Sequence, residues 1–145
     1  MIPELLPTGL LPPGIHDASL DEVIERFGST LWRRWLIEGL RKALNDLARS
    51  GCRAAYVDGS FVTAKTKPND YDLCWDTDGV RLEDLPAEFR DLAPPRQMQR
   101  AKYRGDLLPN VIERGAGSLM LDFFRTDRES GESKGILRID PRSVA

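Results

Sequence analysis

The chain has 145 residues, of which 41% are hydrophobic and 30% charged, and its formal net charge is −2. This length and composition predict one globular domain with a hydrophobic core, residues 1–145, rather than a disordered chain or a pair of domains. Because no excess of positive charge attracts nucleic acid, any contact with nucleic acid requires a local basic patch.

An apolar, proline-rich stretch, MIPELLPTGLLPPG, begins the sequence. Its prolines and Glu4 prevent an apolar helix, and it lacks a basic leading segment, so it does not have the pattern of a secretory signal. We expect an extended arm over about residues 1–14 that lies on the body of the protein or on a partner. No other stretch approaches the roughly 18 to 20 apolar residues of a membrane span, so we expect a cytoplasmic protein without membrane contact.

Two helices are expected after this arm. Ser19 followed by Glu22 is a capping-box pattern, which predicts a short helix over residues 20–27. A longer amphipathic helix follows, capped by Ser29 or Thr30. Its predicted buried stripe consists of apolar residues at steps of three and four: Trp32, Trp35, Leu36, Leu40, Ala43, Leu44 and Leu47.

Short β-rich runs occupy the rest of the chain. CRAAYVDGS (residues 52–60) predicts a strand that ends at a Gly-Ser pair, and YDLCW (residues 71–75) predicts a second one. Later strands are expected in AKYRGDLLPNVI (residues 101–112), SLMLDFF (residues 118–124, a strand or buried segment) and SKGILRID (residues 133–140).

Residues 80–92 predict a loop and an amphipathic helix that Pro94 and Pro95 end. Its expected inward side chains are Leu82, Leu85, Phe89 and Leu92. The order of these elements predicts an α+β fold with a single mixed β-sheet and helices packed mainly on one face.

Asp70 and Asp72 stand at alternate positions where the second strand begins. On a strand such residues point to one face, roughly 6.5 Å apart. Two carboxylates held side by side repel one another, and burial adds to the penalty. A divalent cation removes this repulsion, and Mg²⁺ is typically held by one or two carboxylates together with substrate phosphates. The pair therefore predicts a site for Mg²⁺ or Mn²⁺.

A phosphate site is expected beside this pair. Gly59 allows a ligand to approach the backbone closely. If SFVTAKT begins a short helix, Ser60 lies at its N-terminus, where free N–H groups suit an anion. Lys65 and Lys67 add positive charge. Together these residues predict a nucleoside triphosphate bound through its metal ion.

The stretch GSFVTAKTKPNDYD resembles the Gly-Ser and Asp-x-Asp signature of the polymerase-β-like nucleotidyltransferase superfamily. It is most similar to the small minimal nucleotidyltransferases of prokaryotes, which include antitoxins that transfer AMP to a partner toxin. The resemblance covers residues 31–108. It implies a Mg²⁺-dependent transfer of a nucleoside monophosphate to a hydroxyl group, with Asp70 and Asp72 as catalytic metal ligands and Gly59, Ser60 and Lys65 as nucleotide-binding residues.

The superfamily also needs a third carboxylate, which ligates a second metal ion or accepts the proton of the attacking hydroxyl. Asp106 is the favoured residue, because it lies on the strand expected after the helix. Asp122 is the alternative; it is set in an apolar strand, where an unpaired charge is costly.

The acceptor is expected to be a hydroxyl of a toxin-like protein partner or an RNA end. Larger relatives build the acceptor pocket from an added helical domain, so here a partner or a second copy of the chain would complete it. One alternative is a catalytically degenerate fold that binds and neutralises a partner. A sugar-nucleotide transferase with an Asp-x-Asp pair is a third, less favoured hypothesis, because such enzymes need a larger sheet.

Two alternative roles are open for the basic residues in the second half of the chain. The cluster of Arg96, Arg100, Lys102 and Arg104 is expected to be a solvated face, with a grip on triphosphate or RNA as the alternative. Lys134 is expected at the surface, with contact to the triphosphate as its alternative.

Four other residues receive no catalytic role. Asp58 is read as a loop or cap residue, and His16 as an exposed or hydrogen-bonded residue of the arm. Cys52 and Cys74 have neither disulfide-framework nor metal-site spacing, so we expect half-buried, reduced thiols.

Overall fold

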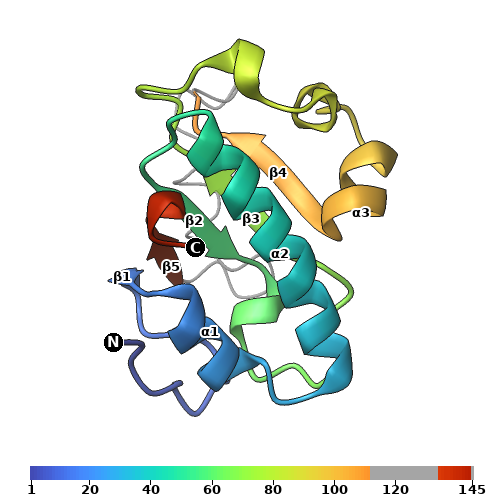
Figure 1. Ribbon diagram of the computed structural model, residues 1–145. Helices are drawn as coiled ribbons and strands as arrows, with labels where there is room; N and C mark the ends of the chain where they lie inside the picture. Colours follow the sequence, from blue (N-terminus) through green and yellow to red (C-terminus); the bar gives the residue numbers. More distant parts are fainter. Residues whose placement is uncertain (112–133, 145) are drawn as a thin grey trace.

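A computed structural model describes residues 1–111 and 134–144, which form one five-stranded sheet and three α-helices (Figure 1). In chain order the elements are β1 (Gly14–Asp17), α1 (Leu20–Phe27), α2 (Leu31–Arg49), β2 (Ala55–Asp58), β3 (Tyr71–Trp75), α3 (Gln97–Tyr103), β4 (Gly105–Pro109) and β5 (Gly135–Ile139).

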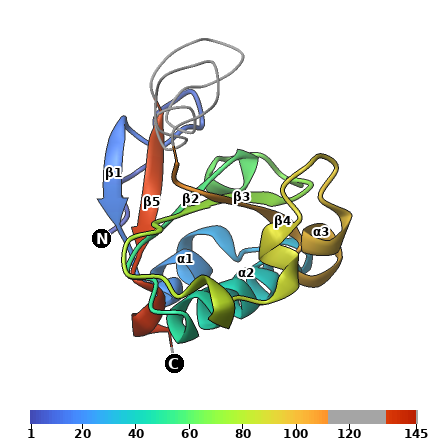
Figure 2. The same cartoon turned by 90° about the horizontal axis from the view of Figure 1, so that it is seen from above.

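The sheet has the strand order β1-β5-β2-β3-β4. β1 runs parallel to β5 and β3 runs parallel to β4, whereas β2 is antiparallel to both of its neighbours. Figure 2 shows α1 and α2 lying against one face of this sheet. The predicted α+β fold with a single mixed sheet is therefore confirmed.

The predicted helix starts are confirmed, with Thr30 rather than Ser29 as the cap of α2. The Ser19 hydroxyl accepts a hydrogen bond from the backbone N–H of Glu22, whose carboxylate accepts one from the backbone of Ser19. The Thr30 hydroxyl accepts one from the N–H of Arg33 in the same way. These side chains satisfy N–H groups that the first turn of a helix leaves without a partner.

The hydrophobic core lies between α2 and the sheet. Leu36, Leu40 and Leu44 of α2 are fully buried, as are Val57 and Leu73 of the two central strands. The prediction that Trp35 also belongs to the core is wrong, because its side chain is 45% exposed. The buried stripe of α2 runs through Leu36, Ile37 and Leu40, and Trp35, one residue before Leu36, is turned about 100° away from Leu36 on the side opposite to Ile37.

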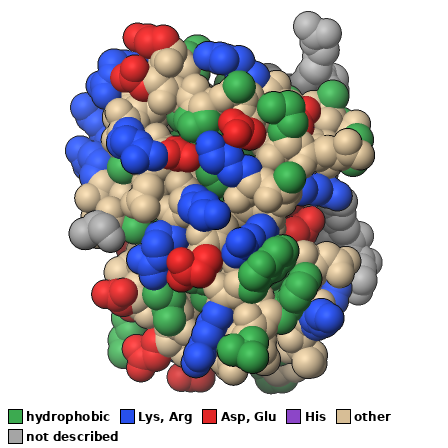
Figure 3. All heavy atoms as spheres, turned by 45° about the vertical axis from the view of Figure 1, so that its right-hand side comes forward, with side chains coloured by type: hydrophobic (Ala, Val, Ile, Leu, Met, Phe, Trp, Pro, Cys, Tyr) green, Lys and Arg blue, Asp and Glu red, His purple; other side chains and the backbone are tan. Residues whose placement is uncertain are grey.

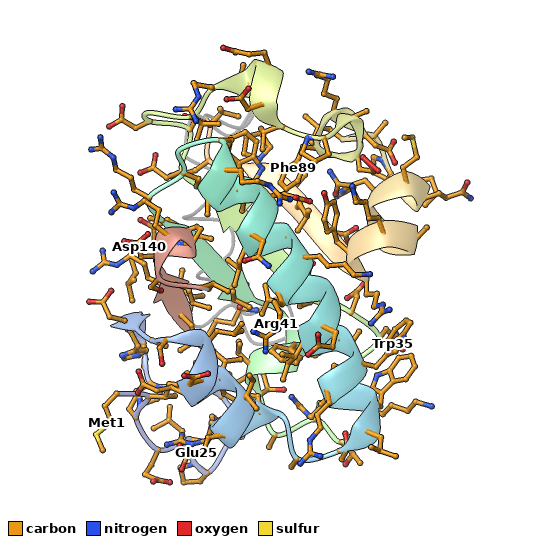
Figure 4. The ribbon with its side chains drawn as sticks, in the orientation of Figure 1. Met1, Glu25, Trp35, Arg41, Phe89 and Asp140 are labelled. Carbon is orange, nitrogen blue, oxygen red and sulfur yellow. The ribbon has the colours of Figure 1, made fainter. Side chains whose placement is uncertain are left out.

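Trp35 instead joins a stack on the flank of α2, where Figure 4 shows it pointing outward. Its ring stacks on Trp32 with centroids 5.0 Å apart. Lys67 lies over the ring of Trp32, and Arg104 lies over the ring of Trp35. The Trp32 indole also donates a hydrogen bond to the carbonyl of Pro68, so the stack ties two loops to α2.

The N-terminal arm lies on the body of the protein. Ile2 and Leu11 are buried in the core, and the Arg26 guanidinium donates to the carbonyls of Ile2 and Pro3. The arm then continues into β1, a strand that was not predicted, because its backbone partner β5 is distant in the sequence.

The helix predicted over residues 80–92 is wrong. Two single 3₁₀ turns, Leu82–Asp84 and Ala87–Arg90, replace it. Pro86 separates them, since proline lacks the N–H that a continuous helix needs and holds the preceding residue in an extended conformation. Of the four side chains expected to point inward, Leu85 and Phe89 are buried, whereas Leu82 and Leu92 are exposed.

Helix α3 was not predicted, and the strand expected from residue 101 begins only at Gly105. Close packing on α2 holds the end of α3 in place. A Cβ atom at Gly39 would lie 2.1 Å from the carbonyl oxygen of Tyr103, and the Tyr103 hydroxyl donates to Oδ2 of the buried Asp46 at 2.6 Å.

Of the two strands predicted after β4, one lies within the described residues and the other lies outside them. β5 confirms the strand expected near the end of the chain. The segment of residues 118–124, with the alternative carboxylate Asp122, lies outside the described residues. Among the described helices, none combines the length and apolarity that crossing a membrane requires.

Candidate active site

Three aspartates form a row across the sheet, one on each of three adjacent strands. Asp72 of β3 is the register partner of Asp58 on β2 and of Asp106 on β4. Register partners on neighbouring strands point to the same face of a sheet. Because Val57 and Leu73 point into the core, the alternating aspartates point to the opposite face. We call Asp58, Asp72 and Asp106 the carboxylate row.

Asp70 lies one residue before β3, next to this row. Burial raises the pKa of the Asp70 carboxyl above its ordinary value, and the charge of Asp106 raises it further, while Arg100 and Lys65 oppose the shift. The structure therefore brings together Asp70, Asp72 and Asp106, the three carboxylates that were predicted to form one site.

Two arginines neutralise the β4 end of the row. Arg100 donates from Nε to Oδ1 of Asp106 at 3.0 Å and from Nη2 to Oδ2 at 2.9 Å, which is a bidentate pair. The same Nη2 lies 3.9 Å from Oδ2 of Asp70. On the other side, Nε of Arg96 lies 3.8 Å from Oδ1 of Asp106. The hydrogen bonds to Asp106 chiefly, with the charges of Asp70 and Asp72, raise the pKa of the Arg100 guanidinium.

Gly59 connects the row to the predicted phosphate site. Its φ of 88° and ψ of −175° lie in a region that is essentially confined to glycine. A Cβ atom there would stand 2.8 Å from Oδ2 of Asp72. The backbone of the Gly-Ser pair is therefore packed directly against one carboxylate of the row.

The helix expected to start at Ser60 is a single 3₁₀ turn, Ser60–Val62. One turn aligns too few peptide groups for a helix dipole, so the electrostatic part of the predicted anion site is weaker than expected. Lys65 is exposed, and its charge acts on Asp70. Lys67 lies over the ring of Trp32 and belongs to the aromatic stack.

Arg33 holds the loop between β2 and β3. Its side chain donates to the carbonyls of Phe61 at 2.6 Å, Thr63 at 2.9 Å and Lys65 at 2.6 Å. The residue is only 4% exposed, and burial lowers the pKa of its guanidinium. In the sequence Arg33 has the appearance of a polar residue on the outer face of α2. The only sequence signal for this role is weak: Thr30 caps α2, which places Arg33 in the first turn of the helix, beside the loop.

Asp58 and Lys134 form a buried ion pair at the β2 end of the row. Nζ of Lys134 lies 3.3 Å from Oδ1 of Asp58, and their side chains are 14% and 4% exposed. The expectation of a surface lysine is wrong, and Asp58 is a member of the site that sequence reasoning missed. Its position directly before Gly59, at the end of a strand, is the signal that would have found it.

A family model described as "Family of unknown function (DUF6932)" matches residues 3–140. The chain belongs to this family. The match includes every residue of the carboxylate row and the Gly-Ser pair. The comparison with curated proteins and the comparison with solved structures each gave no match.

The donors of this DUF6932 chain suit Mg²⁺ or Mn²⁺ by their chemistry, because Asp70, Asp72 and Asp106 offer hard carboxylate oxygens. The penalty on the charged form of Asp70 is of the kind that a cation relieves. Within residues 1–111 and 134–144, no three His, Cys, Asp or Glu side chains stand as a ready group of metal ligands. At Asp106 the guanidinium of Arg100 supplies the neutralising charge.

The predicted basic cluster of the DUF6932 chain is divided among different partners. Arg96 and Arg100 face Asp106, whereas Lys102 pairs with Glu88 at 3.3 Å and Arg104 covers Trp35. On the face shown in Figure 3, acidic side chains lie between the basic ones. These four basic residues therefore do not form a uniform solvated face, because each one contacts another side chain of the protein.

Three of the four residues that received no catalytic role, His16, Cys52 and Cys74, are not members of the carboxylate row. Nε2 of His16 is 2.7 Å from the carbonyl oxygen of Pro12, so this histidine is hydrogen-bonded to the arm as expected. Cys52 and Cys74 are free thiols and fully buried rather than half-buried. Burial raises the pKa of Cys52 to about 11 and that of Cys74 to about 12.

Proposed function

We propose that this chain is a Mg²⁺- or Mn²⁺-dependent nucleotidyltransferase that moves a nucleoside monophosphate from a triphosphate, ATP first among the candidates, to a hydroxyl group. The observation that carries the proposal is the direct pairing of Asp72 with Asp106 on parallel strands, with Asp70 beside them. The packing of Gly59 against Asp72 supports it, because the Gly-Ser pair and the Asp-x-Asp pair then face one space.

Each residue has a role in this proposal. Asp70 and Asp72 would hold the metal, and Asp106 would complete the ligands or accept the proton of the attacking hydroxyl. Gly59 and Ser60 would present backbone N–H groups to the triphosphate, with Lys65 adding charge. Bound divalent ions orient the triphosphate and stabilise the charge on the pyrophosphate as it leaves.

The acceptor in this proposal is a hydroxyl of a protein partner or of an RNA end. The described residues provide the carboxylate row and the Gly-Ser loop but no separate acceptor domain. A partner, as in a toxin–antitoxin pair, or a second copy of the chain would complete the acceptor site.

Isothermal titration with ATP, CTP, GTP and UTP, each with and without Mg²⁺, tests the proposal. We expect binding that depends on the metal and is weakened about tenfold or more in Asp70→Asn/Asp72→Asn, since even supporting residues of a metal site change affinity by about 10- to 100-fold. Asp78→Asn, an exposed aspartate beyond the end of β3, is the matched control and should bind as the unchanged protein does. Metal-independent binding, or equal binding by the double variant, contradicts the proposal.

A degenerate fold that binds a partner without chemistry is the second candidate. The observation in its favour is the engagement of Asp106 by Arg100 and Arg96, which leaves this carboxylate already neutralised. This candidate predicts no triphosphate binding in the same titration, and an Asp70→Asn variant that retains its partner.

A further inference from the structure

Arg100 occupies a central position among the acidic side chains of the site. It projects from α3, and its guanidinium engages both oxygens of Asp106 at 3.0 Å and 2.9 Å. One nitrogen of the same guanidinium is 3.9 Å from Asp70. A single protein cation thus bridges two of the three carboxylates that would hold a metal ion.

A metal ion and this guanidinium compete for the same space. A divalent ion bound between Asp70 and Asp106 would lie within a few ångströms of the Arg100 side chain. Two positive charges at such a separation repel one another, and more strongly in a partly buried site than in water. The guanidinium of Arg100 therefore weakens the binding of a metal ion between Asp70 and Asp106.

The side chain of Arg100 is able to move away from Asp106. It is 48% exposed, so it can turn toward solvent without opening a cavity in the core. Arg96 differs from it, because its side chain is only 15% exposed and stays beside Asp106. A guanidinium fork also pairs with phosphate oxygens as well as with a carboxylate.

We propose that Arg100 exchanges partners when the site is loaded: it releases Asp106 to the metal ion and pairs with the phosphates that arrive with that ion. Arg100 is then a positioning residue that couples metal binding to triphosphate binding. The metal alone binds weakly because it must displace a cation, and a triphosphate offsets this by giving Arg100 a new anionic partner. By linkage, each ligand strengthens the binding of the other by the same factor. This inference rests on the proposed function.

Mn²⁺ binding followed by electron paramagnetic resonance, without any nucleotide, tests the first half of the exchange. Arg100→Gln should bind Mn²⁺ about tenfold more tightly or better, because about 1.4 kcal/mol of lost repulsion corresponds to a factor of ten. Lys102→Gln is the matched control: it removes one positive charge from the same helix, but Lys102 pairs with Glu88. Its Mn²⁺ affinity should change little.

Titration of the Mn²⁺-loaded protein with ATP tests the second half. Here Arg100→Gln should bind ATP more weakly than the unchanged protein, so that the same substitution strengthens metal binding and weakens nucleotide binding. General damage to the fold would weaken both. Arg100→Lys keeps a positive charge without the planar fork, and its Mn²⁺ affinity should therefore stay near that of the unchanged protein.

The outcomes separate this inference from the proposed function. An Arg100→Gln variant that binds Mn²⁺ no more tightly than the unchanged protein overturns the exchange, even if triphosphate binding is normal. If triphosphate fails to bind to any variant, the proposed function fails, whereas tighter Mn²⁺ binding by Arg100→Gln would still show competition between metal and guanidinium.

Discussion

The carboxyl group of Asp70 is partly buried beside a second acid, and its charged form is disfavoured for both reasons. Burial is the larger cause of its raised pKa and Asp106 the next. A carboxyl whose pKa is higher in the folded protein than in the unfolded chain binds its proton more readily when folded. Its contribution to stability therefore falls as the pH rises from the ordinary value of 3.8 through the raised one.

Asp70→Asn removes this titration. In the absence of metal, we expect the variant to be more stable than the unchanged protein at neutral pH, and the difference to disappear as the pH falls below 3.8, where the Asp70 carboxyl is protonated in both states. Urea unfolding across this pH range measures it. The exposed Asp78→Asn serves as the control, and a gain in stability that is constant with pH would contradict the stated cause.

Gly59 carries the strongest backbone constraint of the site. Gly59→Ala combines a positive φ with a Cβ atom 2.8 Å from Asp72 Oδ2, and we expect a loss of about 1–3 kcal/mol in the free energy of unfolding. Gly79→Ala is a useful comparison, because Gly79 also has a positive φ (78°) but a Cβ atom there would meet nothing closer than 3.8 Å. Denaturant unfolding should show the larger loss at Gly59, and only Gly59→Ala should disturb ligand binding at the carboxylate row.

At the scale of elements, the loop between β2 and β3 depends on one arginine of α2. Arg33→Met keeps most of the side-chain volume but removes the donor that three loop carbonyls share. We expect a loss of about 3 kcal/mol or more, because a buried acceptor left without its partner costs about 1–3 kcal/mol.

Thermal and denaturant unfolding measure this loss, and limited proteolysis should show new cleavage within residues 60–70. Arg34→Met is the matched control, since Arg34 is exposed and donates to the single carbonyl of Gly28. Equal losses for the two variants would show that the loop does not depend on Arg33.

The elements that were predicted correctly are those with local signals. The capping box of Ser19 and Glu22 and the alternating apolar residues of YDLCW are complete within a few residues of chain. Helix α3 lacks such a signal. Its place depends on Gln99, whose side-chain amide donates to the carbonyl of Leu107 and accepts from the N–H of the same residue. The amide group thus pairs with β4 in the way a neighbouring strand would. No pattern in the sequence around Gln99 predicts this pairing.

In the candidate site too, some residues were predicted from local sequence signals and others were missed. Asp70 and Asp72 were found from their spacing along the chain. Asp58 has the weaker signal of its position before Gly59, its place in the row is set by its register with Asp72, and Lys134 reaches it from the residue that precedes β5. Register between strands distant in the sequence depends on the packing of the whole sheet, which a single sequence does not display.

At the scale of the whole molecule, the two thiols report on global unfolding. Cys52 and Cys74 are fully buried, and their pKa values are raised to about 11 and about 12, so the reactive thiolate is scarce in the folded protein at pH 8. We expect both to react with an aromatic disulfide reagent only as fast as the fold opens, and rapidly in denaturant. Fast labelling of either thiol at native conditions would show that its part of the core opens locally.

The position of β5 between β1 and β2 affects how the chain is made in the cell. On the ribosome, β1 emerges early but has no strand to pair with until residues 135–139 follow. Until then β2 presents a bare edge, which is the kind of surface that associates with other chains. A growing chain paused before residue 135 would therefore be a natural client for a chaperone that shields open sheet edges.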